Sequence, residues 1–249
     1  GADAYNVAVG YDVGKSVTTG VNNTIIGGFA GDALTTGENN VAIGRSALST
    51  EDSYGYNVAV GTYALLNQNA GDNAYNTAVG YGAGENVTTG VRNTIMGGLA
   101  GDAFTTGSDN VVMGYAALSN PNAGNRSIAI GSSALNAQNA GSAGQNMYNT
   151  GVGYNAGGSM TTGTFNTLIG GLTGDAVTTG HHNIAIGYSA LSTEDGNGYN
   201  IAIGSYALQD QNAGADAYNI AIGHNAGKEV STGVQNTIVG GLSGDALTT

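Results

Sequence analysis

The chain has 249 residues and a formal net charge of −12, with 45 glycines, one proline, and neither cysteine nor tryptophan. Hydrophobic residues make up 41% of the chain, too many for a disordered protein, and the glycines follow no Gly-X-Y period of the collagen type. The few basic residues are scattered and no apolar run reaches the ~18 residues of a membrane span, so we expect neither nucleic-acid binding nor membrane insertion.

A short phrase recurs from the beginning of the chain to its end. It opens with Asn6, continues with Val, Thr or Ile, then Ala or Ile, then Val or Ile, and closes with Gly10. Successive copies close 17 residues apart, with occasional steps of 19 and 22 residues, at Gly10, Gly27, Gly44, Gly61, Gly80, Gly97, Gly114, Gly131, Gly153, Gly170, Gly187, Gly204, Gly223 and Gly240. Self-similarity at a fixed period indicates a repeat architecture.

Four types of repeat follow one another in a fixed order and form a longer period. These superrepeats cover about residues 6–75, 76–148 and 149–218, with a partial copy at 219–249. The second type reads GGFAGDALTTG at 27–37, and the fourth type carries the insertions. We therefore predict a single repeat array over residues 1–249. Because its opening string GADAYN recurs inside the array and neither end has a capping repeat, we expect a fragment of a longer fibre.

Seventeen residues are too few for a helical hairpin and suit two short strands joined by turns. We predict an all-β parallel β-solenoid (a β-roll or β-helix) of about fourteen coils of 17–22 residues. Positions are numbered here from the Asn that opens each phrase. Positions one and three share one face of a strand, and position three is always Val, Ile or Met, so this face is predicted to point into the coil.

Other columns of the repeat predict the rest of the coil. Coils of the third and fourth types have Leu at position eight (Leu48, Leu65), whereas the first and second types have an apolar residue at position eleven (Val17, Leu34). We expect both to fill the wall opposite the strand. The opening Asn, replaced once by Ser127, is expected to form a hydrogen-bonded ladder and to tolerate left-handed backbone.

Position two is then predicted to face outward. It is mostly Ala, with Ile or Leu in every fourth coil, and an uncharged strip of this length is poorly suited to water. We hypothesise that sister chains cover it. The oligomer interface would consist of Ala8, Ile25, Ala42, Ala59, Ala78, Ile95, Val112, Ala129, Leu168, Ala185, Ala202, Ala221 and Ile238.

The strings YNVAVG, NNVAIG and NIAIGYSAL resemble the Asn-x-Ala-Ile-Gly-x-x-Ala repeats of YadA-like trimeric adhesin heads. They are still more similar to the arrays of bacteriophage tail-fibre proteins. The resemblance covers essentially the whole chain. It implies a left-handed solenoid, a homotrimer, and an extracellular location on a virion tail fibre or cell surface. The chain departs from the adhesin heads in its 17-residue coil and its four-coil superrepeat.

Candidate chemistry is sparse, and we predict no catalytic residue, no cofactor and no metal site. Asp32, Asp102, Asp175 and Asp245 each stand alone in a coil and are expected to complete turns. Glu51-Asp52 and Glu194-Asp195 are expected to be solvated loop acids, with calcium binding as the alternative. His181, His182 and His224 are expected to be surface turn residues. The tyrosines that follow the glycine (such as Tyr11, Tyr81 and Tyr154) are expected to pack between coils, with glycan binding as the alternative.

These patterns predict a non-enzymatic structural protein. The first hypothesis is the rigid shaft of a phage tail fibre or the adhesive stalk of a surface protein, self-associated as a homotrimer and presenting a tip to a cell-surface receptor or glycan. The second is an extracellular filament whose subunits stack end to end. An ice- or carbohydrate-binding solenoid is ranked below both, because Thr-Thr-Gly occurs in only two of the four coil types and leaves a broken threonine array.

Overall fold

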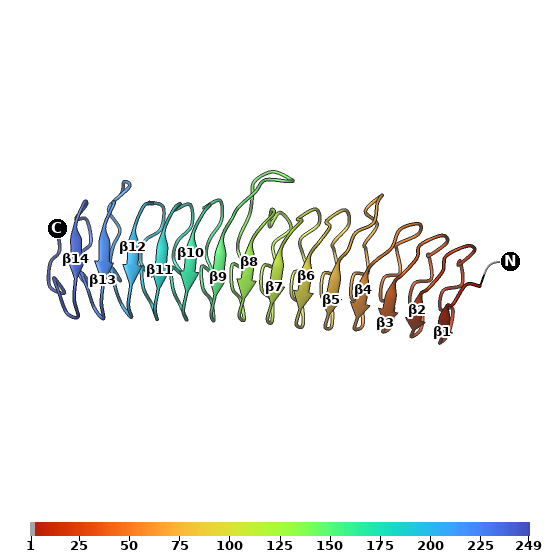
Figure 1. Cartoon of the computed structure of the whole chain (residues 1–249). Coiled ribbons are helices and arrows are strands. Elements are labelled where there is room, and N and C mark those ends of the chain that lie inside the picture. Colours follow the sequence, from red (N-terminus) through yellow and green to blue (C-terminus); the bar gives the residue numbers. More distant parts are fainter. Residues whose placement is uncertain (1–2) are drawn as a thin grey trace. The chain divides into compact units, whose positions relative to one another are not determined.

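The computed structural model describes residues 3–249, and all the regular structure in that range is β-strand. The chain divides into two compact units, one ending at Asn122 and the other beginning at Ala123. Each unit is a parallel β-solenoid, as predicted, but each coil has one three-residue strand instead of the two short strands expected (Figure 1). The strands of the first unit are β1 (Val7–Val9), β2 (Thr24–Ile26), β3 (Val41–Ile43), β4 (Val58–Val60), β5 (Thr77–Val79), β6 (Thr94–Met96) and β7 (Val111–Met113). Those of the second are β8 (Ile128–Ile130), β9 (Thr150–Val152), β10 (Thr167–Ile169), β11 (Ile184–Ile186), β12 (Ile201–Ile203), β13 (Ile220–Ile222) and β14 (Thr237–Val239).

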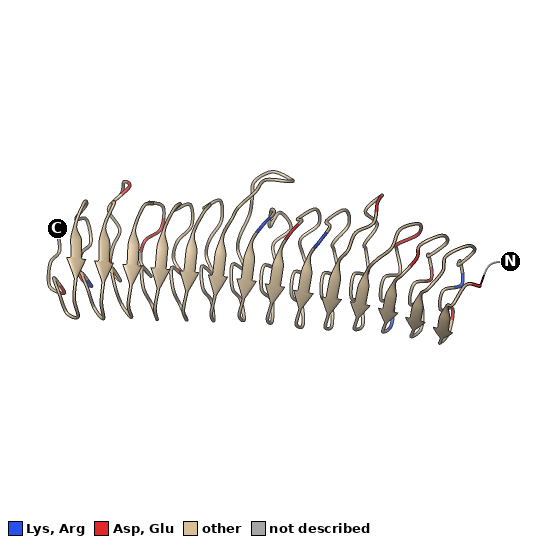
Figure 2. Cartoon of the chain, in the orientation of Figure 1, with Lys and Arg blue, Asp and Glu red and all other residues tan. Residues whose placement is uncertain are grey.

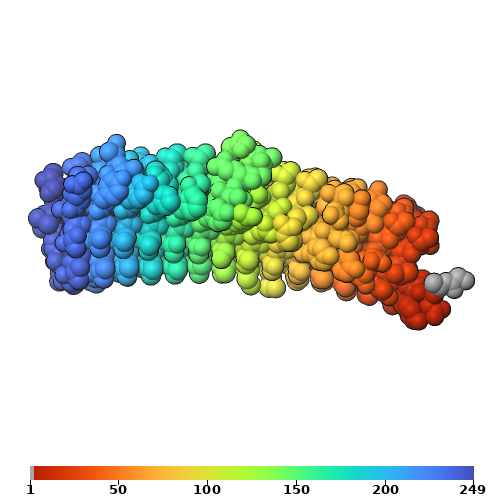
Figure 3. Space-filling model, turned by 45° about the horizontal axis from the view of Figure 1, so that its top comes forward, coloured from red at the N-terminus to blue at the C-terminus, as the bar shows by residue number. Residues whose placement is uncertain are grey.

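Within each unit, consecutive strands pair in parallel and in the same register. Ala42 of β3, for example, lies opposite Ile25 of β2 on one side and Ala59 of β4 on the other. Equivalent positions of successive phrases therefore stack directly on one another. Longer coils keep this register because their extra residues leave the coil as a loop, most visibly between β8 and β9 (Figures 1 and 3).

The strand face that points into the coil is the opposite of the predicted one. In β3, Ala42 at position two is fully buried, whereas Val41 and Ile43 are partly exposed. The residues assigned to an oligomer interface therefore belong to the core, with the exception of Ala8 in the first strand, which is exposed. The buried ones are Ile25, Ala42, Ala59, Ala78, Ile95, Val112, Ala129, Leu168, Ala185, Ala202, Ala221 and Ile238. These side chains cannot contact a sister chain without unfolding of the coil.

The physical reason for this inversion is that the coil is thin. At Leu48 and Leu65, which occupy position eight, the Leu side chain is buried and position two of the same coil is Ala. Where position eight is Gly, as at Gly14 and Gly31, the space is filled by Ile25 from the strand of the second coil. A Cβ atom placed on Gly14 would lie 3.1 Å from Cδ1 of Ile25, and one on Gly31 would lie 3.2 Å from its Cγ2. Large residues thus alternate between the two walls, which keeps the core close-packed.

The predicted asparagine ladder is confirmed, with one change. The Oδ1 of Asn23 accepts a hydrogen bond from the backbone N–H of Asn40 at 2.9 Å, and its Nδ2 donates to the carbonyl of Gly37 at 2.8 Å. Each Asn thus joins its own coil to the next. The left-handed residue of this corner is the one before the Asn, such as Asn22 with φ of 59° or Tyr56 with φ of 63°.

The glycine that closes each strand is required by the stacking. Gly44 has a φ of +134°, and a Cβ atom at this residue would lie 2.5 Å from the carbonyl carbon of Gly61 in the next coil. No other residue type fits both this backbone conformation and this approach. The glycine column therefore sets how closely the coils lie on one another.

Candidate functional surface

In each unit, the strands present a continuous uncharged surface to solvent, which we call the outer sheet face. It consists of positions one and three of every phrase, and no strand contains a charged residue (Figure 2). Its largest side chains are substantially exposed, for example Met96 at 42% and Ile222 at 38%. Position one is Val, Ile or Thr and position three is Val, Ile or Met in every coil, so the repeat preserves an apolar surface that folding of the coil does not bury.

The dimensions of the outer sheet face follow from strand geometry. Three residues span about 10 Å, and seven strands about 4.8 Å apart span roughly 34 Å, which gives each unit a flat face of roughly 340 Å². Soluble monomers seldom expose larger apolar patches, and such patches commonly mark interaction sites. This face replaces the buried position-two strip as the candidate association surface.

The corner beside this face carries a second column of side chains, which we call the corner column. It consists of the left-handed residue that precedes each opening Asn. In the second unit, five of these residues are consecutive rings, with centroids 4.9–5.1 Å apart and planes inclined by 17° or less: Tyr148, Phe165, His182, Tyr199 and Tyr218. Each inner ring has neighbours on both faces. Sugars bind to open aromatic faces, so this stack is better suited to joining coils than to holding a glycan.

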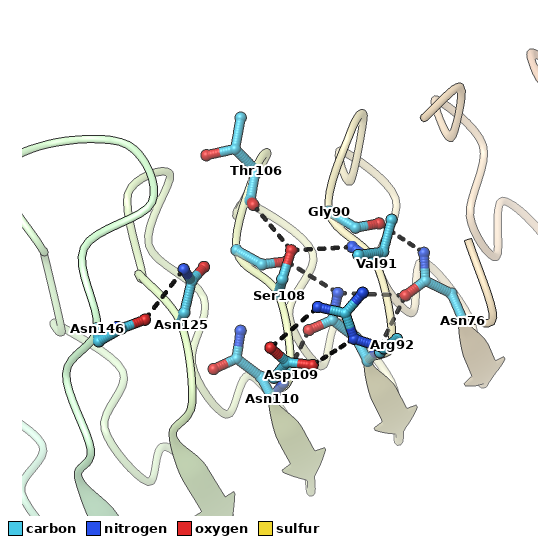
Figure 4. A network of polar contacts seen from close by, with 12 residues as sticks. Asn76, Gly90, Val91, Arg92, Thr106, Ser108, Asp109, Asn110, Asn125 and Asn146 are labelled. Atoms are coloured by element: carbon cyan, nitrogen blue, oxygen red, sulfur yellow. Dashed lines mark hydrogen bonds and ion pairs between the residues drawn. The ribbon is translucent and has the colours of Figure 1, made fainter. Parts of the chain in front are cut away.

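In the first unit the corner column contains rings and an ion pair. Tyr56 and Tyr75 stack at 5.1 Å, and the hydroxyl of Tyr56 donates to Glu38 at 3.3 Å. The negative charge of Glu38, and then this hydrogen bond, raise the pKa of Tyr56. The guanidinium of Arg92 binds both carboxylate oxygens of Asp109, at 2.6 and 3.1 Å (Figure 4), and this bond raises the pKa of Arg92. Stacked coils therefore bring several corner side chains into contact with their counterparts in the next coil.

Several of the tyrosines that follow the glycine pack against rings of neighbouring coils, as predicted. Tyr63 and Tyr81 meet edge to face at 6.0 Å, and Tyr188 and Tyr206 at 5.5 Å. Several of these rings are also exposed, including Tyr81. The sequence reasoning found this row but overlooked the corner column, although the recurring Tyr-Asn pairs (such as 56–57, 75–76 and 199–200) were a usable signal.

Two of the predicted loop acids lie inside the solenoid. Glu51 and Glu194 are fully buried, which corrects the expectation that they are solvated. Burial raises the pKa of both carboxyl groups, and the backbone amide of Tyr54, hydrogen-bonded to Glu51, opposes that shift. Both residues occupy position eleven, the column that contains Leu34 in an earlier coil. Their side chains therefore face the core rather than water.

The remaining candidate acids and histidines lie near the surface. Asp32 forms an ion pair with Lys15 at 3.5 Å, and partial burial raises the pKa of Asp175. His182 and His224 are exposed, as predicted for turn residues. Among residues 3–249, no three His, Cys, Asp or Glu side chains gather in a group that could hold a metal ion. The same range contains no helix of sufficient length and hydrophobicity to cross a bilayer.

The Thr-Thr-Gly segments form links between coils. The hydroxyl of Thr18 donates to the carbonyl of Thr35 at 3.1 Å, and the hydroxyl of Thr35 donates to the carbonyl of Asp52 at 2.9 Å. Thr88 and Thr161 donate in the same way. The first threonine of each segment thus stabilises the stack instead of contributing its hydroxyl to a free surface array.

No protein-family model, curated protein or solved structure matches the chain. Its function is therefore argued from the geometry of the coils and of the outer sheet face.

Proposed function

We propose that the chain is a shaft segment of an extracellular fibre, such as a phage tail fibre or an adhesive stalk, and that it self-associates through the outer sheet face. The observation that carries this proposal is that every coil presents Val, Ile, Met or Thr on a face that points away from its own core. Folding alone does not require large apolar residues at position three. Association of copies of the chain does.

The cross-links within each unit support a mechanical role. Within each unit, successive coils are joined by strand pairing and by the asparagine ladder, and the coils that contain Thr-Thr-Gly are also joined to the next by threonine hydroxyls. Pulling coils apart requires these bonds to break together. A role in transmitting force or maintaining distance needs such links and needs no catalytic group.

The partner that fits best is another copy of the same chain. The face is uncharged and its composition repeats with the coil, so two copies present matching apolar rows. A face of roughly 340 Å² in one unit is smaller than the ~800 Å² per partner of a typical stable interface. We therefore assign both units and the flanking corner columns to the contact, arranged as a homotrimer.

Light scattering tests the proposal directly. We expect a mass near three times 24.5 kDa for the wild type. The double substitution Ile169→Lys and Ile222→Lys places charges on the outer sheet face and should yield a folded monomer. The control substitution Thr18→Lys, outside this face, should leave the mass unchanged.

A wild-type chain that remains monomeric at all concentrations would refute association through this face. A mass that keeps growing with concentration would instead support the filament. Thermal hysteresis from a monomer would assign the face to ice, since six of its rows begin with Thr: Thr24, Thr77, Thr94, Thr150, Thr167 and Thr237.

A further inference from the structure

Two sets of buried polar atoms lack hydrogen-bond partners, and the two sets are copies of one another. The first consists of Glu51 Oε2, Asn57 Nδ2 and Gln68 Nε2, and its equivalent two superrepeats later consists of Glu194 Oε2, Asn200 Nδ2 and Gln211 Nε2. All six residues are fully buried. A buried polar group without a partner costs about 1–3 kcal/mol, so a feature that appears twice calls for a ligand.

The repeat register places Glu51 and Gln68 in adjacent layers of one column. Both occupy position eleven, in the coils opened by Asn40 and Asn57. The same column holds the buried Leu34 one coil earlier. The carboxyl group and the amide group therefore lie in the coil interior, one layer apart.

The amide of Gln68 is oriented by the following coil. Its Oε1 accepts a hydrogen bond from Nδ2 of Asn76 at 2.7 Å, which directs Nε2 to the other side. Gln138 shows where that side is, because its Oε1 is bound by Asn149 at 2.9 Å while its Nε2 donates to Ser127 Oγ at 2.9 Å. Ser127 occupies the same repeat position as Asn57. The Nε2 of Gln68 thus faces the side chain of Asn57.

The side-chain amide of Asn57 has lost its usual acceptor because of the insertion in its coil. Asn40 and Asn76 donate from Nδ2 to the carbonyl fourteen residues later, at Tyr54 and Gly90. The equivalent residue for Asn57 is Gly71, which lies in the inserted loop. Its amide cannot simply flip, because Oδ1 accepts the backbone N–H of Asn76 at 3.1 Å.

The glutamate supplies the missing acceptor. Oε1 of Glu51 accepts the backbone N–H of Tyr54 at 3.0 Å, and Oε1 of Glu194 accepts from the backbone and side chain of Asn197, both at 3.0 Å. The second oxygen of each carboxyl group is thereby left for the interior. Each pocket combines two N–H donors and one carboxylate acceptor.

This combination selects the ligand. A metal cation would be repelled by the N–H donors and an anion by the carboxylate, whereas water both accepts and donates. Buried waters typically make about three hydrogen bonds to otherwise unsatisfied groups. We propose that each pocket binds one buried water molecule, which accepts from the Asn57 and Gln68 amides and donates to Glu51, or correspondingly from Asn200 and Gln211 to Glu194.

The second superrepeat is a natural comparison. Pro121 stands at the position of the glutamate and Ser127 at that of the asparagine. There, Nε2 of Gln138 donates to the carbonyl of Ala123 as well as to Ser127 Oγ, so the chain itself satisfies this amide. We therefore assign two water sites, one in each of the other complete superrepeats.

The test is a count of long-lived waters by ¹⁷O magnetic relaxation dispersion. The double substitution Glu51→Leu and Gln68→Leu removes the polar groups of one pocket and should lower the count by one. Leucine is chosen because the same column already contains Leu34. Adding Glu194→Leu and Gln211→Leu should lower it by two. Asn67→Ala, at a partly exposed asparagine of the same coil, should leave the count unchanged. An unchanged count in the folded Leu variants would overturn the proposal.

A milder variant keeps the test decisive if the Leu variants do not fold. Asn57→Ser introduces the residue present at 127 and lets Gln68 donate to a hydroxyl, as Gln138 does. With the fold verified by circular dichroism, the count should again fall by one. Retention of the full count in this variant would equally overturn the assignment.

Discussion

A Cβ atom on Gly31 would lie 3.2 Å from Cγ2 of Ile25, so the glycine of one wall and the isoleucine of the other are complementary in volume. The same relation joins Gly84 to Ile95 and Gly174 to Leu168. The core of each coil therefore depends on pairs of positions, one on each wall. A change at either member alone produces a clash or a cavity.

Substitution Gly31→Ala should destabilise the fold by about 1–3 kcal/mol, as overpacking of a core does. The added methyl group would lie 2.8 Å from Leu34 Cδ1 as well as against Ile25. Urea unfolding measures the change. Gly71→Ala is the control, because Gly71 also has a positive φ, of 74°, but no atom lies within 4 Å of its added Cβ. Equal losses in both variants would show that backbone conformation, not packing, determines the cost.

Substitution Asn40→Ala should cost about 2 kcal/mol or more, since it leaves the buried N–H of Asn57 and the carbonyl of Tyr54 without their partner. Urea unfolding again gives the free energy. Asn67→Ala removes only an exposed hydrogen bond to Asn86 and should change stability by less than about 0.5 kcal/mol. A small effect at Asn40 would mean that the ladder follows from the stacking and does not stabilise it.

Stability should depend on pH through the buried glutamates. Burial raises the pKa of Glu51 and Glu194 above 4.5, so the folded chain binds these protons more tightly than the unfolded chain. The stability that protonation provides is complete below the unfolded pKa of 4.5 and is lost as pH rises through the raised folded pKa.

A variant that cannot titrate at these residues isolates this effect. Relative to Glu51→Gln with Glu194→Gln, the wild type should lose stability across that pH window, as measured by denaturant unfolding at a series of pH values. The exposed acids contribute equally to both proteins and cancel in the difference. A difference that does not change with pH would contradict the raised pKa values.

The stacked rings of the corner column should contribute to stability although they are exposed. Phe165 lies between Tyr148 and His182, at 5.1 and 4.9 Å, and Phe165→Leu should cost about 0.5–1.5 kcal/mol and reduce the near-ultraviolet circular dichroism. Tyr154→Leu is the control, because this ring is 63% exposed and stacks on no ring among the described residues. Indistinguishable losses would indicate that the stack only follows the coil spacing.

The period, the strand positions and the inter-coil ladder were predictable from the sequence because stacking repeats them in every coil. Because the opening Asn and the closing Gly each recur at intervals of 17 residues in most coils, there is little choice of register between coils. The column at position eight was likewise predictable as a wall, since Leu48 and Leu65 have no other place to be buried.

The usual rule that larger apolar residues face the core did not predict which face of the strand points into the coil. Ala42 is inside and Ile43 outside because Leu48 already fills the coil. Only the joint variation of Gly31 with Ile25 in the same coil contains this information. The burial of Glu51 was not predicted for a related reason. Position eleven changes from apolar to acidic between coils, and an acidic residue was expected to be exposed to solvent.

The stacking register also makes the fold independent of the number of superrepeats in the chain. Because strands within each unit pair with the strand before and the strand after them through equivalent positions, the gain or loss of a whole superrepeat should leave these neighbour contacts as they were. Near-identical strings such as STEDSYGYN at 49–57 and STEDGNGYN at 192–200 are natural points for recombination. The length of the solenoid can therefore change in fixed increments, one superrepeat at a time, without substitution of any residue.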